Sequence, residues 1–501
     1  MYLADYWNPT AKWFDASEHE WKSIALPNSA GGVMVAPDAS AVYFASYDGR
    51  AIYVVDPATA SVVATIPLGA DAPWARGSVM AVSPDSSTLF VTGDSGVLTK
   101  IDTVTRKVTG SIRLAIDGDL SSVVVSPDGR TVYTLGYYDP ALFTVDAATM
   151  TLVERRATFQ DPQGMQITPD GLKLLVGSAF DSYPGHSVLA AHRTIDRSIL
   201  GEVSADAFGS AFGPSAMAIS PDASVVYSLD ADGFFSTIDV DTLATLGQVD
   251  LGDVTSAATI ANIALTADGM TAVAAIPSIG VDFVDTATGV AVRQTNSGET
   301  FFAVSVVPDQ APIAQFTAEM GPAGEATVFD ASTSTAAVCP VGTYDWDFGD
   351  GSTSSETTPM IEHTYAKAGD YTTQLTVTTT CGTSTQTVFT GQTALRNGGE
   401  TAVATLTRTV EALATPIDPT TTEPTKPDPG TPPVSPLVTQ TAPQTGHTGA
   451  IRVPRKPAAG EGSADSLAMT GADPLPLLLG AAAFSVAGAA LIMARRRRPR
   501  A

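Results

Sequence analysis

The chain has 501 residues, with 52 acidic and 27 basic side chains, and its net charge is −25 at pH 7. This length predicts more than one domain. The acidity excludes a nucleic-acid-binding role, because no basic patch exists to neutralise phosphates. Two cysteines and five scattered histidines do not predict a zinc site. We therefore expect neither a metal nor a cofactor.

A unit of roughly 40–50 residues recurs through residues 1–309. The first landmark of a unit is a pair of apolar residues followed by a turn that contains Asp. The second is an apolar residue followed directly by Asp, with a Thr three residues after that Asp. The first landmark stands at Pro37-Asp38, Pro84-Asp85, Pro127-Asp128, Pro169-Asp170, Pro221-Asp222, Ala267-Asp268 and Pro308-Asp309. The second stands at Val55-Asp56, Ile101-Asp102, Val145-Asp146, Ile238-Asp239 and Val284-Asp285.

Short alternating apolar runs between these turns indicate about four strands per unit, which is typical of a β-propeller blade. The runs, for example 51–56 (AIYVVD), resemble the YVTN class of surface-layer and lactonase-like propellers. The N-terminal stretch 2–27 matches strands two to four of a unit, and 302–309 matches strand one alone. We predict that the two stretches form a shared seventh blade, which removes the open edges of the ring.

In such a ring, the connections from the last strand of one blade to the first strand of the next gather at one end of the channel. We predict that any ligand binds there, on Asp71, Trp74, Arg76, Asp117, Asp119, Asp161, Gln163, Phe208, Phe212 and Asp253. Aromatic rings beside carboxylates suit a sugar, a peptide or a cation. The alternative is that these residues are ordinary loop composition.

The fourth unit departs from the others. It carries an insertion around Phe180–His186, and His192 stands where the other units have Asp. One interpretation is a ligand loop specific to this blade, with His186 and His192 near each other. The other is a turn that has drifted on a tolerant surface.

Residues 310–411 have a different pattern, centred on 344–351 (YDWDFGDG). This stretch resembles a PKD domain, which implies an immunoglobulin-like β-sandwich with Trp346 in its core. Cys339 precedes the Trp strand and Cys381 follows the strand over 372–380, so we predict a Cys339–Cys381 disulfide. The PKD motif accounts for Asp347 and Asp350 as turn formers, and calcium is the weaker interpretation.

Residues 412–466 are rich in Pro and Thr, which favours an extended stalk over a packed domain. Residues 467–501 then begin with Leu467, Ala468, Met469, Thr470 and Gly471. An uncharged run over 475–494 follows, long enough to span a bilayer as a helix, and five arginines end the chain.

This tail resembles the sorting signal of Gram-positive surface proteins. The resemblance implies that a sortase cuts after Thr470 and joins it to peptidoglycan, from a precursor that crosses the membrane once. Ala468 replaces the usual Pro, as in the variant signals of high-GC species. The alternative is a membrane anchor that is never cut. Pro443-Gln444-Thr445-Gly446 lacks the leading Leu and a following apolar run, so we interpret it as stalk.

A sorted protein must be exported, yet Met1–Asp5 does not begin a signal peptide. We therefore expect the export signal ahead of Met1, through a late start codon or a sequence incomplete at that end. The chain has no nucleophile elbow, phosphate loop or zinc-protease motif. We predict an extracellular, cell-wall-anchored protein that binds an unknown glycan or protein ligand without catalysis. The alternative is a wall-tethered, lactonase-like enzyme.

Overall fold

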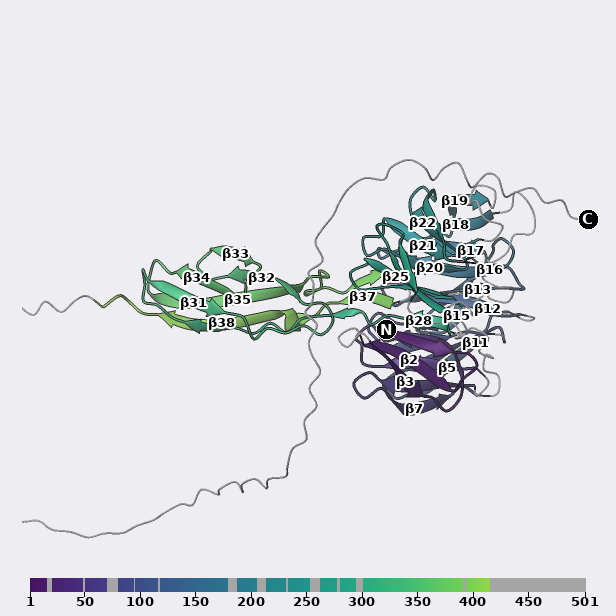
Figure 1. Cartoon of the computed structure of the whole chain (residues 1–501), viewed down its shortest axis with the longest axis horizontal. Coiled ribbons are helices and arrows are strands. Elements are labelled where there is room, and N and C mark those ends of the chain that lie inside the picture. Colours follow the sequence, from purple (N-terminus) through teal and green to yellow (C-terminus); the bar gives the residue numbers. More distant parts are fainter. Residues whose placement is uncertain are drawn as a thin grey trace, which may run out of the picture. The chain divides into compact units, whose positions relative to one another are not determined.

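The computed structural model describes residues 1–15, 20–47, 50–69, 80–93, 95–115, 118–178, 187–204, 213–230, 233–252, 262–276, 280–293, 301–390 and 393–414. The described chain is built almost wholly from β-strands (Figure 1). The all-β prediction is confirmed. The predicted stalk beyond residue 414, the Thr470 motif and the apolar run 475–494 lie outside the described residues. Within those residues, no helix has both the length and the apolar character needed to cross a membrane.

Seven antiparallel four-stranded sheets make up the first domain. Blade 1 has β4 (Ala30–Val35), β5 (Val42–Ser46), β6 (Ala51–Asp56) and β7 (Ser61–Pro67). Blade 2 has β8 (Met80–Val82), β9 (Thr88–Val91), β10 (Val97–Asp102) and β11 (Lys107–Arg113). Blade 3 has β12 (Leu120–Val125), β13 (Thr131–Gly136), β14 (Ala141–Asp146) and β15 (Thr151–Ala157). Blade 4 has β16 (Pro162–Ile167), β17 (Lys173–Ser178), β18 (Ser187–Arg193) and β19 (Ile199–Ser204).

The remaining three blades follow the same order. Blade 5 has β20 (Ala216–Ile219), β21 (Val225–Leu229), β22 (Phe234–Asp239) and β23 (Thr245–Asp250). Blade 6 has β24 (Asn262–Leu265), β25 (Thr271–Ile276), β26 (Gly280–Asp285) and β27 (Ala291–Arg293). Blade 7 joins β28 (Phe301–Ser305) to β1 (Tyr2–Asp5), β2 (Thr10–Asp15) and β3 (Glu20–Ala25).

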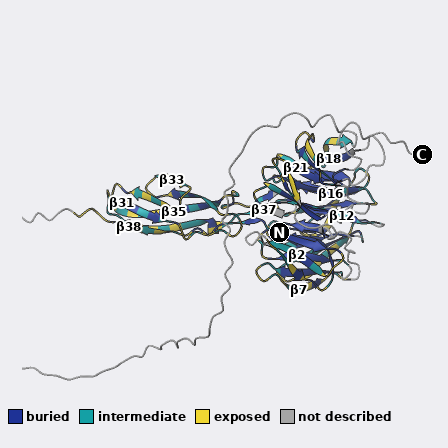
Figure 2. Ribbon diagram, viewed as in Figure 1, coloured by how far each residue is buried: buried dark blue, intermediate teal, exposed yellow. Residues whose placement is uncertain are grey.

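The first strands of the blades form a closed ring. Each contacts the first strand of the next blade, in the order β4, β8, β12, β16, β20, β24, β28 and back to β4. Burial falls from this ring outward: β4 is buried throughout, whereas β7 alternates between exposed and partly buried residues apart from the buried Ile66 (Figure 2). An apolar cluster fills the space between each pair of neighbouring blades. The fold is therefore a seven-bladed β-propeller.

The two ends of the propeller sequence close the ring within blade 7. β1 pairs antiparallel with β28, with Tyr2 opposite Ser305 and Leu3 opposite Val304. Leu3 is fully buried among residues of blades 6 and 7. Across the next interface, the hydroxyl of Ser305 accepts the N–H of Val35 in blade 1 at 3.0 Å. The predicted shared blade is confirmed.

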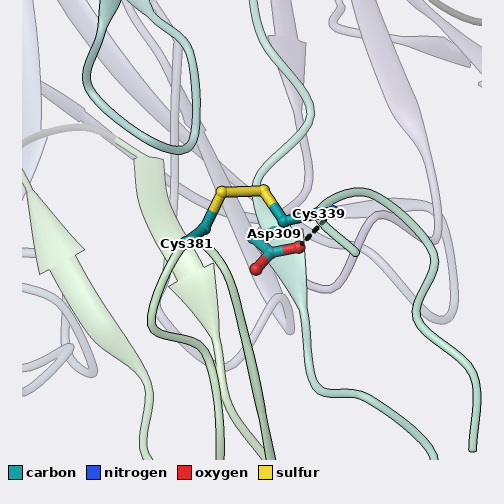
Figure 3. A group of neighbouring side chains, drawn as sticks. All are labelled: Asp309, Cys339 and Cys381. Carbon is teal, nitrogen blue, oxygen red and sulfur yellow. Dashed lines mark hydrogen bonds between the residues drawn. A yellow bond between two sulfur atoms is a disulfide. The ribbon is translucent and has the colours of Figure 1, made fainter. Parts of the chain in front are cut away.

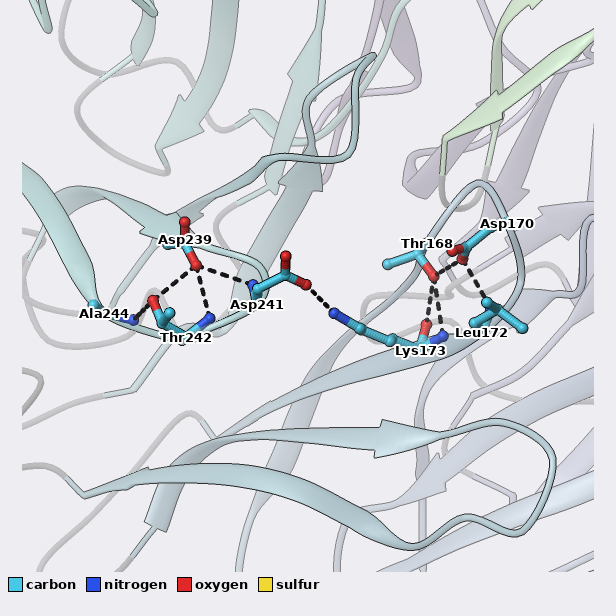
Figure 4. Close-up of polar contacts among 8 residues, drawn as sticks. All are labelled: Thr168, Asp170, Leu172, Lys173, Asp239, Asp241, Thr242 and Ala244. Atoms are coloured by element: carbon cyan, nitrogen blue, oxygen red, sulfur yellow. Dashed lines mark hydrogen bonds and ion pairs between the residues drawn. The ribbon is translucent and has the colours of Figure 1, made fainter.

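The repeated acidic residues hold turns, as the repeat pattern indicated. In blade 4, Asp170 accepts the hydroxyl of Thr168 and the N–H of Leu172 at 2.5 and 2.9 Å. In blade 5, Asp239 accepts the N–H and the hydroxyl of Thr242, both at 2.7 Å. These bonds keep the pKa of the Asp239 carboxyl below its usual value. Lys173 and Asp241 form an ion pair between the two blades (Figure 4).

The second domain is a sandwich of two sheets with a smaller sheet at one end. Its strands are β29 (Asp309–Gln310), β30 (Thr317–Glu319), β31 (Ala326–Asp330), β32 (Val341–Asp347), β33 (Thr353–Glu356), β34 (Met360–Thr364), β35 (Gly369–Thr379), β36 (Val388–Thr390), β37 (Thr393–Asn397) and β38 (Val403–Val410), with a 3₁₀ turn at Glu400–Ala402. The sheet β30-β31-β34 covers the sheet β33-β32-β35-β38. Trp346 is 1% exposed between them, as predicted.

The acidic residues after Trp346 also form turns. Asp347 accepts the N–H of Gly349 at 2.9 Å, and Asp350 accepts the N–H of Ser352 at 3.0 Å. Asp350 also bonds His363 Nε2 at 2.9 Å. These contacts agree with the turn-forming role that the PKD motif gives both carboxylates.

A disulfide joins Cys339 to Cys381, with the two Cα atoms 5.9 Å apart, so the predicted pairing is confirmed. Asp309 lies fully buried beside it (Figure 3). Its carboxylate accepts the N–H of Cys339 at 3.0 Å and the hydroxyl of Thr379 at 2.6 Å. The sequence pattern placed Pro308-Asp309 with the propeller turns. The structure instead makes Asp309 the first residue of β29, which pairs in parallel with β37.

The small sheet β29-β37-β36 connects the second domain to the propeller. Phe389 of β36 is 5% exposed, and it belongs to the apolar cluster between blades 3 and 4 with Val124 and Met165. On β29, Gln310 Nε2 donates to the carbonyl oxygen of Pro37 in blade 1 at 3.0 Å. The second domain thus supplies part of the propeller core.

We expect Phe389→Ala to destabilise the propeller by about 3 kcal/mol, because it leaves a cavity in an apolar cluster. Urea unfolding of the full chain measures this change. Phe389→Leu should cost less, since it keeps most of the buried side chain. Leu413→Ala is the control, because Leu413 is 57% exposed. Equal transitions for Phe389→Ala and Leu413→Ala would show that Phe389 does not support the propeller.

Candidate functional site

The two ends of the propeller have different connections, because neighbouring strands within a blade run antiparallel. At one end lie the Pro-Asp turns and the Asp-to-Thr turns, and we call it the turn end. At the other lie the connections between blades and those from the second strand of a blade to its third. We call this the loop end, and of the predicted ligand residues Asp119, Asp161 and Gln163 lie there.

Three of the predicted residues gather around Tyr137 at the loop end, between blades 3 and 4. Tyr137 follows β13, and its N–H donates to the carbonyl oxygen of Asp119 at 2.9 Å. Burial raises the pKa of the Tyr137 phenol, and the charges of Asp161 and Asp119 raise it further. A hydrogen bond with Gln163 acts in the opposite direction. We call Asp119, Tyr137, Asp161 and Gln163 the Tyr137 cluster.

Asp161 has the most unusual environment of the cluster. Burial raises the pKa of its carboxyl, whereas hydrogen bonds lower the pKa values of the turn carboxylates Asp128 and Asp239. Its backbone has a φ of 51°, in the left-handed region that few non-glycine residues adopt. Its neighbours are fixed by bonds from Ser121 to the carbonyl oxygen of Pro162 (2.5 Å) and from Ser178 to that of Gln160 (3.0 Å). A carboxylate held in this way is suited to accept hydrogen bonds from a ligand.

Two strongly exposed aromatic rings also lie at the loop end. Tyr138 is 68% exposed and lies edge-to-face with Tyr137, with ring centroids 4.9 Å apart. Trp7 is 67% exposed and lies edge-to-face with Tyr6 at 4.9 Å. The sequence analysis missed both rings because it considered only the connections between blades. Paired aromatics directly after a second strand were the available signal.

The structure leaves most of the predicted ligand face untested. Asp119, Asp161 and Gln163 come together, whereas the others lie outside the described residues: Asp71, Trp74, Arg76, Asp117, His186, Phe208, Phe212 and Asp253. A loop site built on those positions stays a prediction.

The interpretation of His192 as a loop ligand is wrong. It is the sixth residue of β18, at the far end from the connection that holds His186, and it is 2% exposed. Its partner in the sheet is Leu174, whereas Arg193 lies opposite Lys173. In blade 3 the corresponding partners are Val145 and Asp146. His192 therefore occupies the buried aliphatic position of the other blades, and Arg193 occupies the Asp position.

The environment of His192 opposes its protonation. Burial lowers the pKa of the imidazole, and the nearby Arg156 adds to this effect. A weak bond to the carbonyl oxygen of Arg197 and the charge of Glu202 act in the opposite direction. Among the described residues, His192 Nε2 has no hydrogen-bond partner. His192 is therefore a packing residue, and protonation of its buried imidazole at acidic pH destabilises the propeller.

One group of side chains has the spacing of metal ligands in the described ranges. It consists of Asp309, Cys339 and Cys381. The sulfur atoms are joined in the disulfide and are not thiolates, and the carboxylate already accepts two hydrogen bonds. The group is therefore interpreted as a structural junction.

Comparison with known proteins supports the fold of the second domain. Residues 309–393 match the family described as the PKD domain. No curated protein matches the chain. Kuenenia stuttgartiensis hydrazine synthase aligns at 18% identity and TM-score 0.46, over 57% of this chain and 90% of its own. The Myceliophteria thermophila Cps50 (Swd1) β-propeller domain aligns at 13% identity and TM-score 0.46, and the alignment covers 57% of this chain and 92% of that domain's chain. The second domain is thus a PKD domain.

We expect His192→Val to remove an acid sensitivity of the propeller. Folding lowers the pKa of the His192 imidazole, so the wild-type propeller has its full stability above the unfolded-state pKa of about 6.5. As the pH falls below that value, the free energy of unfolding of the wild type decreases by up to about 1.4 kcal/mol per pH unit. Urea unfolding of both chains from pH 8 to pH 5 measures the difference. A constant difference across this range would contradict the role assigned to His192.

Proposed function

We propose that this chain is a non-enzymatic surface protein of a Gram-positive bacterium that presents its propeller for ligand binding or adhesion. The PKD domain acts as a spacer, residues 412–466 act as a stalk, and Thr470 is joined to peptidoglycan by a sortase. A propeller combined with a PKD domain supports a surface or binding role. The signal over 467–471, followed by the apolar run and the arginines, supports the anchoring.

The observation that carries the binding role is the loop end beside blades 3 and 4. It places Asp161 and Gln163 beside Tyr137, whose ring lies edge-to-face with the exposed ring of Tyr138. The carboxylates at the turn end are used by their own turns, as Asp170 and Asp239 are. Binding sites combine apolar surface with a few placed polar groups, which favours the loop end.

The alternative is a wall-tethered enzyme of the lactonase-like propeller type. It is favoured by the raised pKa of the Asp161 carboxyl beside the Tyr137 phenol, since perturbed acids gather at catalytic sites. Turnover of a lactone panel by the wild type, lost in Asp161→Asn, would replace the binding proposal with the enzymatic one. Equal, background-level turnover by both chains would support binding.

For binding, we expect the chain through Thr470, the part that sorting would join to the wall, to retain a saturable partner from wall polysaccharides, glycans and matrix proteins. Gln163→Ala should weaken this retention at least tenfold, because it removes a polar contact of the Tyr137 cluster. Val104→Ala at the turn end is the control, since Val104 is 83% exposed. Retention that neither variant alters would place the ligand elsewhere.

For anchoring, we expect Thr470→Ala to move the protein from the wall fraction to the membrane and the medium. Thr445→Ala is the matched control, since Thr445-Gly446 lacks the rest of the signal. Mass spectrometry of muramidase-released peptides should find chains that end at Thr470 and carry a cross-bridge amine. Wall-associated peptides that run intact through Thr470-Gly471 would contradict sorting.

A further inference from the structure

Tyr138 forms a rigid aromatic platform at the loop end. Its ring is 68% exposed, but the residues on either side of it are held in place. Tyr137 lies edge-to-face with it and is bonded through its N–H to the carbonyl oxygen of Asp119. Asp139 forms an ion pair with Arg155 of β15. A ring fixed before binding loses little conformational entropy when a flat apolar surface stacks on it.

A second platform of the same design lies on blade 7. Trp7 is 67% exposed and lies edge-to-face with Tyr6, whose ring lies 4.3 Å from that of Tyr47 in blade 1. The carboxylate of Asp5 accepts the N–H groups of Trp7 and Asn8, both at 3.0 Å. Trp7 and Tyr138 both follow the second strand of a blade, so both lie at the loop end. Two platforms on different blades favour a ligand that is a polymer, because a chain bound at both gains avidity.

The polar groups near Tyr138 match sugar hydroxyls. The carboxylates of Asp119 and Asp161 accept hydrogen bonds, and the amide of Gln163 both donates and accepts. A sugar ring offers hydroxyl groups at its edge and an apolar C–H face, which is the combination that a ring beside such groups can bind.

Charge excludes acidic sugars. The carboxylates of Asp119 and Asp161 lie beside Tyr137, and the nearby guanidinium of Arg155 is already paired with Asp139. The whole chain carries a net charge of −25. Uronic acids and phosphate-bearing polymers would therefore be repelled from the Tyr137 cluster.

The surroundings of Tyr138 favour a glycan over a peptide. One common mode of peptide binding adds a strand to a free sheet edge. The free edges of the blades are their fourth strands, and Tyr138 does not lie on one of these. It follows the second strand of blade 3 and presents an open ring.

We infer that the loop end binds a carbohydrate polymer without acidic groups, stacked on Tyr138 and Trp7 with its hydroxyls on Asp161 and Gln163. This inference rests on the proposed binding function and names its ligand class.

The test is calorimetric titration of the chain through Thr470 with three probes. Two are neutral, cellohexaose and the hexamer of N-acetylglucosamine, and the third is the acidic hexamer of galacturonic acid. We expect at least one neutral probe to bind and the acidic probe not to bind. Tyr138→Ala and Trp7→Ala should each weaken binding at least fivefold, whereas Tyr138→Phe should keep the wild-type affinity because it keeps the ring. Thermal unfolding of each variant verifies that the propeller is intact.

The outcomes separate this inference from the proposed function. Tighter binding of the acidic probe, or binding that neither Ala variant alters, would overturn the inference. If capture retains a protein while neither neutral probe binds, the inference falls and the proposed binding function stands. If neither capture nor titration finds a ligand, both fall.

Discussion

The structure depends on the apolar packing between neighbouring blades. A single four-stranded sheet has two faces to bury, and each face in the ring is covered only by the next blade. Residues such as Leu3, Phe44 and Phe143 are buried in these interfaces, so the ring must close for any blade to be stable. The pairing of β1 with β28 meets this requirement by joining the two ends of the propeller sequence in one sheet. The PKD domain adds Phe389 to one of the same clusters, so the two domains share part of their stabilising core.

The same constraint separates the two ends of the propeller. At the turn end, Asp and Thr residues are used to form tight turns, and their carboxylates already accept hydrogen bonds from neighbouring backbone. At the loop end some connections between blades are longer, such as the one from β7 to β8. Polar and aromatic side chains there are available for a ligand, as Asp161 and Tyr138 show. Stability and binding are thus served by opposite ends of one scaffold, which is a common division in repeat folds.

The arrangement around blades 3 and 4 combines several local features. The left-handed backbone at Asp161, the burial of its carboxyl and the edge-to-face pair of Tyr137 and Tyr138 all occur within one neighbourhood. A carboxyl held against its usual pKa costs stability, so it is expected where function requires it. The raised pKa of the Asp161 carboxyl and the exposed ring of Tyr138 distinguish this neighbourhood from turn carboxylates such as Asp239, and they make it the focus of the proposed function.

The sequence by itself determined the repeat, the four strands of each blade, the shared seventh blade, the PKD domain and the disulfide, because strand alternation and turn chemistry are local. It determined the composition of the loop end, but not which residues meet there. Tyr137 lies beside Asp119 because β12 pairs with β13 within blade 3, but it meets Asp161 only because blades 3 and 4 are neighbours. The register of β18 was also decided by tertiary structure. Counting along the chain placed His192 at an Asp position, but the sheet register gives that position to Arg193, one residue later. In a strand such a shift moves a side chain to the opposite face, and the packing of blades 3 and 4 decided that His192 is buried.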